Sequence, residues 1–167
     1  MLVAIWAQDE NNLIGQNGAL PWHLPEDLRR FQMLTQHHTL VMGRKTYEGM
    51  EKKPLQNRQT IVLTKNANYD PLDPGVLVMN SSSEVLNYAK KVENNKIVYI
   101  AGGVRIYKLF EPYFDKLLRT LIHHSFIGNA YFPAFDYSAF KKIKTQVGIK
   151  NDKNPYNYEF ETFIRQD

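Results

Sequence analysis

The residues TLVMGRKT at positions 39–46 decide the fold, because a short apolar segment runs directly into a glycine, two cations and a hydroxyl. The apolar segment predicts a buried strand, and Gly43 permits a tight passage into a helix that begins near Arg44. The residues IAGGVRIY at positions 100–107 repeat this order of strand, glycine and helix. Two strand-to-helix junctions of this kind predict βαβ units and therefore a largely parallel sheet.

Short, nearly continuous apolar runs recur along the chain at residues 2–7, 39–42, 60–63, 76–79 and 97–101. Their length and β-branched content predict strands, and their lack of polar alternation predicts that both faces of the sheet are covered. The last third differs, since residues 117–123, 130–132 and 156–164 resemble strands with no helix between them. We therefore expect the sheet to finish antiparallel, with loops at residues 11–21, 49–59, 66–75 and 148–155.

Helical spacing of apolar residues appears between several of these strands. Pro25 suits the first position of a helix, and one face of that helix is formed by Leu24, Asp27, Leu28, Phe31 and Thr35. The run SSSE at residues 81–84 predicts a capped helix start, with the helix continuing to about residue 91. A third helix is predicted from residue 103 to about residue 113.

The charge and composition of the chain limit its function classes. Its 167 residues include 21 Lys and Arg against 17 Asp and Glu, a net charge of +4, but the basic residues form scattered pairs. Scattered pairs favour a solvated surface or a small-anion site over a duplex-binding face.

The lack of Cys excludes thiolate metal sites and fits a reducing cytoplasm. The five His show no metal-ligand spacing, and the apolar runs are far shorter than the roughly 20 residues of a membrane helix.

Asp27 is the first residue whose position suggests more than a structural role. It shares a helical stripe with Leu24, Leu28 and Phe31, so its carboxylate faces the apolar interior or a cleft. Two interpretations remain open: an acid in the first turn that the helix dipole favours, or a carboxylate that lines a cleft. In a cleft, a ligand offering two N–H donors in one plane would satisfy the carboxylate.

Glycines and cations at strand ends form the second such feature. The segments at residues 102–103 and 43–46 follow predicted strands, and Thr64-Lys65 follows another. Bare backbone with free N–H groups favours an anion, and the carboxyl ends of parallel strands meet at one edge of a sheet. The pattern predicts one phosphate-rich cofactor along this edge, although a tight turn or ordinary surface charge explains each segment taken singly.

Taken together, these motifs resemble dihydrofolate reductase of the bacterial type. The matching segments stand in that family's order and spacing over essentially the whole chain: LIG (13–15), LPW (20–22), LPEDL (24–28) with Phe31, VMGRKTYE (41–48), PL (54–55) with Arg58, IVLT (61–64), IAGG (100–103) and FP (132–133). The run at residues 21–27, joined to the GRKT segment, carries most of the specificity.

The resemblance implies one domain over residues 1–167 with an α/β fold. Its sheet would be eight-stranded, mostly parallel and twisted, with an antiparallel C-terminal strand and about four flanking helices. The implied reaction is NADPH-dependent reduction of 7,8-dihydrofolate to tetrahydrofolate for one-carbon metabolism, with hydride transfer to C6 and protonation at N5. A cytoplasmic monomer that binds diaminopyrimidine or pteridine antifolates, with no metal, nucleic acid or membrane partner, would be typical of the family.

The same resemblance implies roles for individual residues. Asp27 would bind the pterin ring, Thr120 would support its carboxylate, and Trp22 and Leu20 would act from a loop that closes over the site. Substrate contacts would come from Ile5, Ala7, Asp27, Leu28, Phe31, Met50, Leu55, Arg58, Ala101 and Thr120. Cofactor contacts would come from Ala7, Ile14, Gly15, Gly43, Arg44, Lys45, Thr46, Leu63, Thr64, Lys65, Ala101, Gly102, Gly103, Val104, Arg105, Ile106 and Tyr107. Arg58 would hold the glutamate α-carboxylate, and a cis peptide would join Gly102 to Gly103.

Two departures from the family pattern concern the mobile loop, residues 13–24. Asn129 stands where many bacterial relatives carry an acid that fastens this loop, and Pro155 lies in a later hairpin that some relatives use for loop contacts. We hypothesise that loop closure and product release are tuned differently in this chain.

Other function classes remain as alternatives. A riboflavin-pathway NADPH reductase of the same fold would leave the apolar residues Leu28, Phe31 and Leu55 poorly explained. A nucleotide-binding module without catalysis would not oxidise NADPH, and a nucleic-acid binder would lose affinity steeply with salt.

Overall fold

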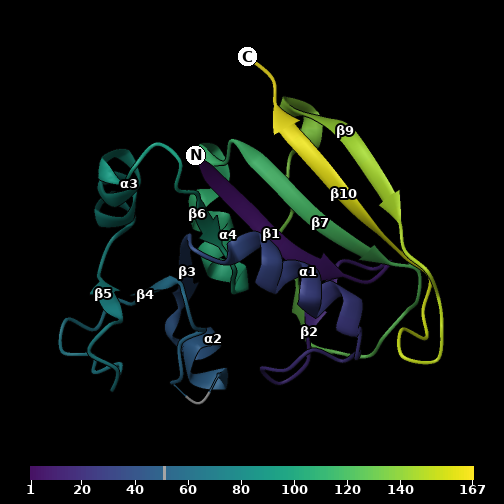
Figure 1. The fold of residues 1–167 in the computed structure, drawn as a ribbon, viewed down its shortest axis with the longest axis horizontal. Helices are drawn as coiled ribbons and strands as arrows, with labels where there is room; N and C mark the ends of the chain where they lie inside the picture. The colour runs from purple at the N-terminus through teal and green to yellow at the C-terminus, as the bar shows by residue number, and fades with distance from the viewer. Residues whose placement is uncertain (51) are drawn as a thin grey trace.

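An eight-stranded sheet forms the centre of the protein, which is known from a computed structural model that describes residues 1–50 and 52–167. The strands follow the order β5-β4-β3-β6-β1-β7-β10-β9 across the sheet (Figure 1). Their bounds are β1 Leu2–Gln8, β3 Thr39–Gly43, β4 Gln59–Leu63, β5 Leu77–Met79, β6 Val98–Ile100, β7 Lys116–Ile122, β9 Phe140–Val147 and β10 Tyr158–Arg165.

The direction of the strands changes only near the C-terminus. All neighbouring pairs from β5 across to β7 are parallel, whereas β10 is antiparallel to both β7 and β9. The predicted α/β class, mostly parallel sheet and antiparallel C-terminal strand are therefore confirmed. Figure 1 shows β7, β10 and β9 fanning out to the right, on the side of the sheet away from β5.

The described residues form four α-helices, which cover the two faces of the sheet: α1 Pro25–Thr35, α2 Arg44–Gly49, α3 Ser82–Lys91 and α4 Val104–Phe110. One core cluster joins the alternate β1 residues Leu2, Ala4 and Trp6 to α3 and α4. A second joins Val3 and Ile5 to α1 and α2, and a third gathers Trp22 and Leu24 against Ile122, Tyr158 and Phe160 of β7 and β10. Because successive side chains of a strand point to opposite faces, the apolar run of β1 is buried on both sides.

The helix ends agree with the sequence signals in two of three cases. Ser81 caps α3 by accepting a hydrogen bond from Glu84 N at 3.3 Å, and α3 ends at Lys91 as predicted. Pro25 is the first residue of α1, as predicted. The third predicted helix stops at Phe110, and a 3₁₀ turn, Glu111–Tyr113, replaces its last turn because Pro112 cannot continue the hydrogen-bond ladder.

Three strand predictions were wrong. Strand β9 was missed because its FKKIKTQV sequence is almost wholly exposed at the sheet edge and carries no apolar run. The predicted loop 11–21 contains β2, Leu13–Gly15, which pairs with β8, Ala130–Tyr131, in a separate two-stranded sheet. Residues 76–79 were expected to be covered on both faces, but β5 is an edge strand in which Leu77 is 41% exposed.

The remaining predicted loops are found at residues 66–75 and 148–155, where the structure has no helix or strand. The predicted loop 49–59 includes Glu51, which lies outside the described residues. A second 3₁₀ turn, Tyr137–Ala139, leads into β9.

Candidate active site

A cleft of about 590 Å³ opens beside α1 at the carboxyl ends of the central strands. Most of its walls come from three parts of the chain: the segment at residues 14–24, the first turns of α1, and residues of β1, β3 and β6 with the helices that follow β3 and β6. Leu55, Thr120 and Ala130 complete the lining. In open parallel sheets, ligands bind at this edge because the strand-to-helix junctions meet there. The cleft is therefore where the fold predicts ligand chemistry.

Asp27 lies in this cleft and is the one acid among the described residues that line it. As the third residue of α1 it is aimed across to β7, where Thr120 Oγ1 donates a 2.5 Å hydrogen bond to its Oδ1. Thr120 is 2% exposed. The two residues are 93 positions apart in sequence, so only the tertiary fold brings them together.

Burial raises the pKa of Asp27 above its ordinary value, while the hydrogen bond from Thr120 and the charge of Arg30 act in the opposite direction. Arg30 also lines the cleft, and its guanidinium lies 4.3 Å from the centre of the Phe160 ring. A desolvated carboxylate with one side-chain hydrogen bond keeps acceptor capacity for a ligand. Of the two interpretations of Asp27, the structure supports the cleft.

The apolar wall of the cleft contains most of the residues that the resemblance assigned to the substrate: Ile5, Ala7, Leu28, Phe31, Met50, Leu55 and Ala101. Leu28 is 54% exposed although it stands on the inward stripe of α1. Its side chain therefore faces the cleft rather than the core. A large apolar side chain held at a cleft wall is typical of ligand sites.

Bare backbone forms another side of the cleft. Gly102 and Gly103 line it and are joined by a cis peptide, as the resemblance implied. Gly102 has φ +112, a conformation that side-chain-bearing residues rarely adopt, and its carbonyl accepts a 2.9 Å hydrogen bond from Gly43 N. The ends of β3 and β6 are thus tied together at this point.

Other predicted cofactor residues surround these glycines. Ile14, Gly15, Lys45, Thr46, Val104 and Tyr107 line the cleft. The Tyr107 hydroxyl donates to Ile5 O at 2.8 Å, and burial raises the pKa of this hydroxyl.

Several predicted cofactor residues lie outside the cleft lining: Gly43, Arg44, Leu63, Thr64, Lys65, Arg105 and Ile106. They nevertheless lie at the ends of strands or in the residues that follow. Gly43 of β3 pairs with Leu63 of β4, so the ends of these two strands are neighbours. Arg44, Lys65 and Arg105 are exposed, and Arg44 forms a 2.6 Å ion pair with Glu48. The structure brings these groups to one edge of the sheet, as predicted, but as a rim rather than a pocket.

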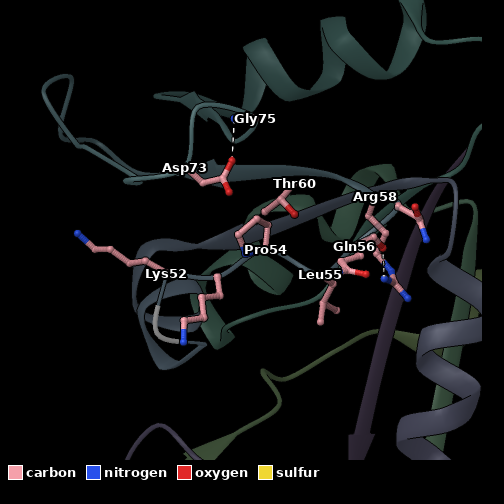
Figure 2. Close-up of a pocket in the computed structure, with 10 residues that line it drawn as sticks. Lys52, Pro54, Leu55, Gln56, Arg58, Thr60, Asp73 and Gly75 are labelled. Carbon is pink, nitrogen blue, oxygen red and sulfur yellow. Dashed lines mark hydrogen bonds between the residues drawn. The ribbon is translucent and has the colours of Figure 1, made fainter.

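Arg58 lies in a second hollow of about 430 Å³, lined by residues 52–58 together with Thr60, Asp73 and Gly75 (Figure 2). Leu55 lines both hollows, so they adjoin. Figure 2 shows the Arg58 side chain pointing toward the neighbouring helix, where its Nε donates to Thr35 Oγ1 at 2.8 Å and its Nη2 donates to Gln32 O at 2.7 Å. These bonds fix the guanidinium beside α1.

The segment predicted to be mobile carries Leu20 and Trp22, and both line the cleft. Trp22 is buried, whereas Leu20 is exposed. Asn129 contacts this segment directly: its Oδ1 accepts from Asn17 N at 2.9 Å, and its Nδ2 donates to Asn17 Oδ1 at 3.0 Å. The contact between position 129 and this segment is therefore made by a pair of neutral amides and not by an acid.

Sequence reasoning missed several residues of the cleft, chiefly Arg30, His23, Leu40 and Met42. Leu40 and Met42 were predicted only as strand residues, and a buried apolar run carries no signal that any of its residues lines a ligand site. Arg30 could have been found, because it stands three residues after Asp27 on the same helix face.

Among the described residues, no group of three or more His, Cys, Asp and Glu side chains could hold a metal ion. In the same part of the chain, no helix combines the length and the apolar composition needed to cross a bilayer.

Comparison with known proteins gives a family for this fold and site. A family model described as dihydrofolate reductase matches residues 1–165. The chain belongs to the dihydrofolate reductase family. The dihydrofolate reductase of Bacillus subtilis is 42% identical over 96% of this chain and 92% of its own. That of Lactococcus lactis is 38% identical over 98% of this chain and 96% of its own.

A solved structure of dihydrofolate reductase from Enterococcus faecalis, complexed with NADP(H) and RAB-propyl, superposes with a TM-score of 0.95. It is 49% identical in sequence and covers 100% of this chain and 97% of its own. The family assigned from the sequence motifs is therefore confirmed, and a riboflavin-pathway reductase is not favoured.

Proposed function

We propose that this chain reduces 7,8-dihydrofolate to 5,6,7,8-tetrahydrofolate with NADPH, the reaction of its family. The observation that carries the proposal is Asp27, a desolvated carboxylate held by Thr120 in a cleft that is apolar on one side and bare backbone on the other. The reaction consumes one NADPH and one proton, because hydride adds to C6 and a proton adds to N5.

Asp27 acts on the pterin ring in this proposal. Its carboxylate accepts paired hydrogen bonds from the 2-amino group and the adjacent ring nitrogen, which promotes protonation at N5. The raised pKa of Asp27 suits this role, because a group that assists proton transfer works best when its pKa lies closer to the operating pH than that of a solvated carboxyl group. Thr120 orients the carboxylate through its 2.5 Å hydrogen bond.

The residues on the opposite side of the cleft fit NADPH, which supplies the hydride when bound. A Cβ built on Gly103 would lie 3.7 Å from Thr46 Oγ1, so bare backbone and a hydroxyl face the same space. Lys45 lines the cleft beside them, and Arg44, Thr64, Lys65 and Arg105 stand at the adjoining sheet edge. Backbone, hydroxyls and cations together are the donors that phosphates require.

The apolar wall and Arg58 account for the rest of the substrate. Phe31 and Leu55 would contact the aminobenzoyl ring, with Leu28 beside the pterin. Arg58 stands in the hollow that adjoins the cleft at Leu55, where its planar guanidinium would pair with the glutamate α-carboxylate. Closure of the segment carrying Leu20 and Trp22 would exclude water from hydride transfer.

The test is the oxidation of NADPH, followed by its absorbance, with and without dihydrofolate. We expect turnover only when both are present, and a fall in kcat/KM of roughly 100-fold or more for Asp27→Asn, because the carboxyl group is lost. Glu26→Gln is the matched control: it is the adjacent acid on α1, its carboxylate pairs with Arg29, and its activity should stay within about twofold of wild type.

The outcomes separate the proposal from its alternatives. A wild-type protein that binds NADPH without oxidising it would be a nucleotide-binding module and would overturn the proposal. Turnover of a riboflavin-pathway pyrimidine but not of dihydrofolate would assign the other reductase. An Asp27→Asn variant as active as Glu26→Gln would remove Asp27 from the chemistry while leaving the reaction in place.

Antifolates of the diaminopyrimidine and pteridine type belong to the same proposal. Their protonated ring presents two N–H donors in one plane, the pattern that the Asp27 carboxylate accepts. We expect titration to give far tighter binding to wild type than to Asp27→Asn, and only millimolar affinity for wild type would contradict the assignment.

A cytoplasmic monomer with no nucleic-acid partner completes the proposal. The absence of Cys fits a reducing compartment. Size-exclusion chromatography with light scattering tests the monomer, and a mass of twice 19.5 kDa would contradict it.

A further inference from the structure

The helix that carries Asp27 begins without a cap from its own sequence. Leu24 occupies the N-cap position of α1 and offers no side-chain acceptor. The N–H groups of a first helical turn lack partners within the helix and need acceptors from elsewhere. Here the N–H of Glu26 donates to Oδ1 of Asn154 at 2.9 Å, across 128 positions of sequence.

Asn154 is itself held in place for this contact. It is 7% exposed, and both its backbone N and its Nδ2 donate to Asn151 Oδ1, at 2.7 and 3.2 Å. The Asn154 carbonyl in turn accepts from Asn151 N at 2.9 Å. Because Nδ2 is committed to Asn151, the amide is oriented with its oxygen toward α1.

The segment that supplies Asn154 connects directly to the strand pair that holds Thr120. It leads into β10, which pairs with β7 so that Phe160 stands opposite Thr120. Two side chains thus hold consecutive residues of α1: Asn154, from the loop before β10, binds the backbone of Glu26, and Thr120, from β7, binds the carboxylate of Asp27.

We infer that Asn154 is a positioning residue for the reaction: by capping α1 from the β9–β10 loop, it holds Asp27 within reach of Thr120. The inference rests on the proposed role of Asp27. Asn154 touches neither substrate nor cofactor in this account and acts only through α1.

The pH dependence of hydride transfer is sensitive to the position of Asp27. The hydrogen bond from Thr120 lowers the pKa of Asp27 against the larger opposite effect of burial. If the start of α1 loosens, both this bond and the burial of Asp27 change, so the pKa of Asp27 and the pH profile of hydride transfer shift from their wild-type values. The charged and titratable groups near Asp27 are Glu26, Arg29 and Arg30 on α1, Tyr158 on β10, His23 before α1 and Lys45 on α2. Asn154→Ala leaves all of them in place and changes no charge.

The experiment compares Asn154→Ala with Asn157→Ala, which removes the same side chain from an exposed position three residues later. Two readouts are taken on the full chain with NADPH bound: hydride transfer in single turnovers over a range of pH, and hydrogen exchange at the Glu26 amide. For Asn154→Ala we expect exchange roughly five- to tenfold faster, hydride transfer slower by a similar factor, and an apparent pKa moved from its wild-type value. Asn157→Ala should match wild type in both readouts.

Two further variants keep the test decisive. Asn151→Ala frees the amide of Asn154 and should move both readouts in the same direction by less, so it serves if Asn154→Ala does not fold. Asn154→Asp keeps an acceptor oxygen and should restore the protection of the Glu26 amide.

Unchanged exchange at Glu26 in both Asn154→Ala and Asn151→Ala would overturn the capping contact. Faster exchange with an unmoved rate and pH profile would leave a structural cap only and would equally overturn the inference. Failure of the proposed function is a different result, namely a wild-type protein without turnover, and the exchange readout does not depend on it.

Discussion

Asp9 and Asp27 are both acids next to the segment that closes one side of the cleft, but they have opposite surroundings. Asp9 is 0% exposed, and its two oxygens accept three backbone hydrogen bonds, from Asn11 and Leu13 at Oδ1 and from Phe126 at Oδ2. Asp27 accepts one side-chain hydrogen bond, from Thr120, and lines a cleft.

The surroundings of a carboxylate decide whether it is structural or reactive. A carboxylate surrounded by backbone N–H donors has its acceptor sites occupied and ties loops together. A carboxylate that is desolvated but only partly paired has a raised pKa and accepts donors from a ligand. Asp9 therefore joins the backbone at residues 11–13, where the predicted mobile loop begins, to the loop that contains Phe126. Asp27 is available for chemistry.

Asp9→Asn, the isosteric change proposed above for Asp27, should have the largest effect on stability. Asp9→Asn replaces one acceptor oxygen by an NH₂ group that faces backbone N–H donors, so at least one buried donor loses its partner. We expect the free energy of unfolding to fall by about 2–3 kcal/mol, measured by urea denaturation at neutral pH. A loss below about 0.5 kcal/mol would mean that these hydrogen bonds do not hold the loops.

Removal of the Thr120 hydroxyl tests what the side-chain hydrogen bond to Asp27 contributes to its reactivity. In Thr120→Val the carboxylate of Asp27 loses its one side-chain donor, so its pKa rises further. We expect the pH profile of hydride transfer to move to higher pH, and kcat/KM at neutral pH to fall by about tenfold, because a hydrogen bond to a charged group contributes about 1.5 kcal/mol. Thr120→Ser, which keeps a hydroxyl, is the control and should leave the profile where it is.

Asp27→Asn should affect stability in the opposite direction to Asp9→Asn. The pKa of Asp27 is raised above its ordinary value of 3.8 because burial disfavours the charged form. Its contribution to stability is therefore fully present below about pH 3.8 and is lost as the pH rises through the folded-state pKa. We expect Asp27→Asn to be more stable than wild type at neutral pH, with the difference shrinking as the pH falls. Urea denaturation at several pH values measures this difference. A difference in the free energy of unfolding that does not change with pH would contradict the assigned surroundings of Asp27.

The smallest effect is expected at Asn129, where loop contact rather than a carboxylate is at issue. Asn129→Asp keeps the acceptor for Asn17 N and makes that bond charge-assisted, while the Asn17 amide can turn to donate. The segment should open more slowly, and we expect product release in stopped-flow experiments to slow by about two- to threefold. An unchanged release rate would count against the hypothesis that this contact tunes closure.

The parts of the fold that could be predicted are those where local signals and burial agree. The strand ending at Gly43, the helix beginning at Pro25 and the helix capped by Ser81 each carry a signal within a few residues, and the structure confirms all three. The strand β9 could not be predicted because it is stabilised by pairing with β10 and not by burial of its own side chains. The short strand β2 was likewise hidden in a segment whose composition is typical of a loop.

Sequence alone therefore determined the alternation of strands and helices, the parallel edge where glycines and cations gather, and the motifs that mark the family. These properties depend on residues close together in the chain. Tertiary structure decided which acid lines the cleft and which is enclosed, because Thr120 lies 93 positions from Asp27 and Phe126 lies 117 positions from Asp9. It also decided that Asn154 caps the helix of Asp27, since a hydrogen-bond partner 128 positions distant leaves no local pattern in the sequence.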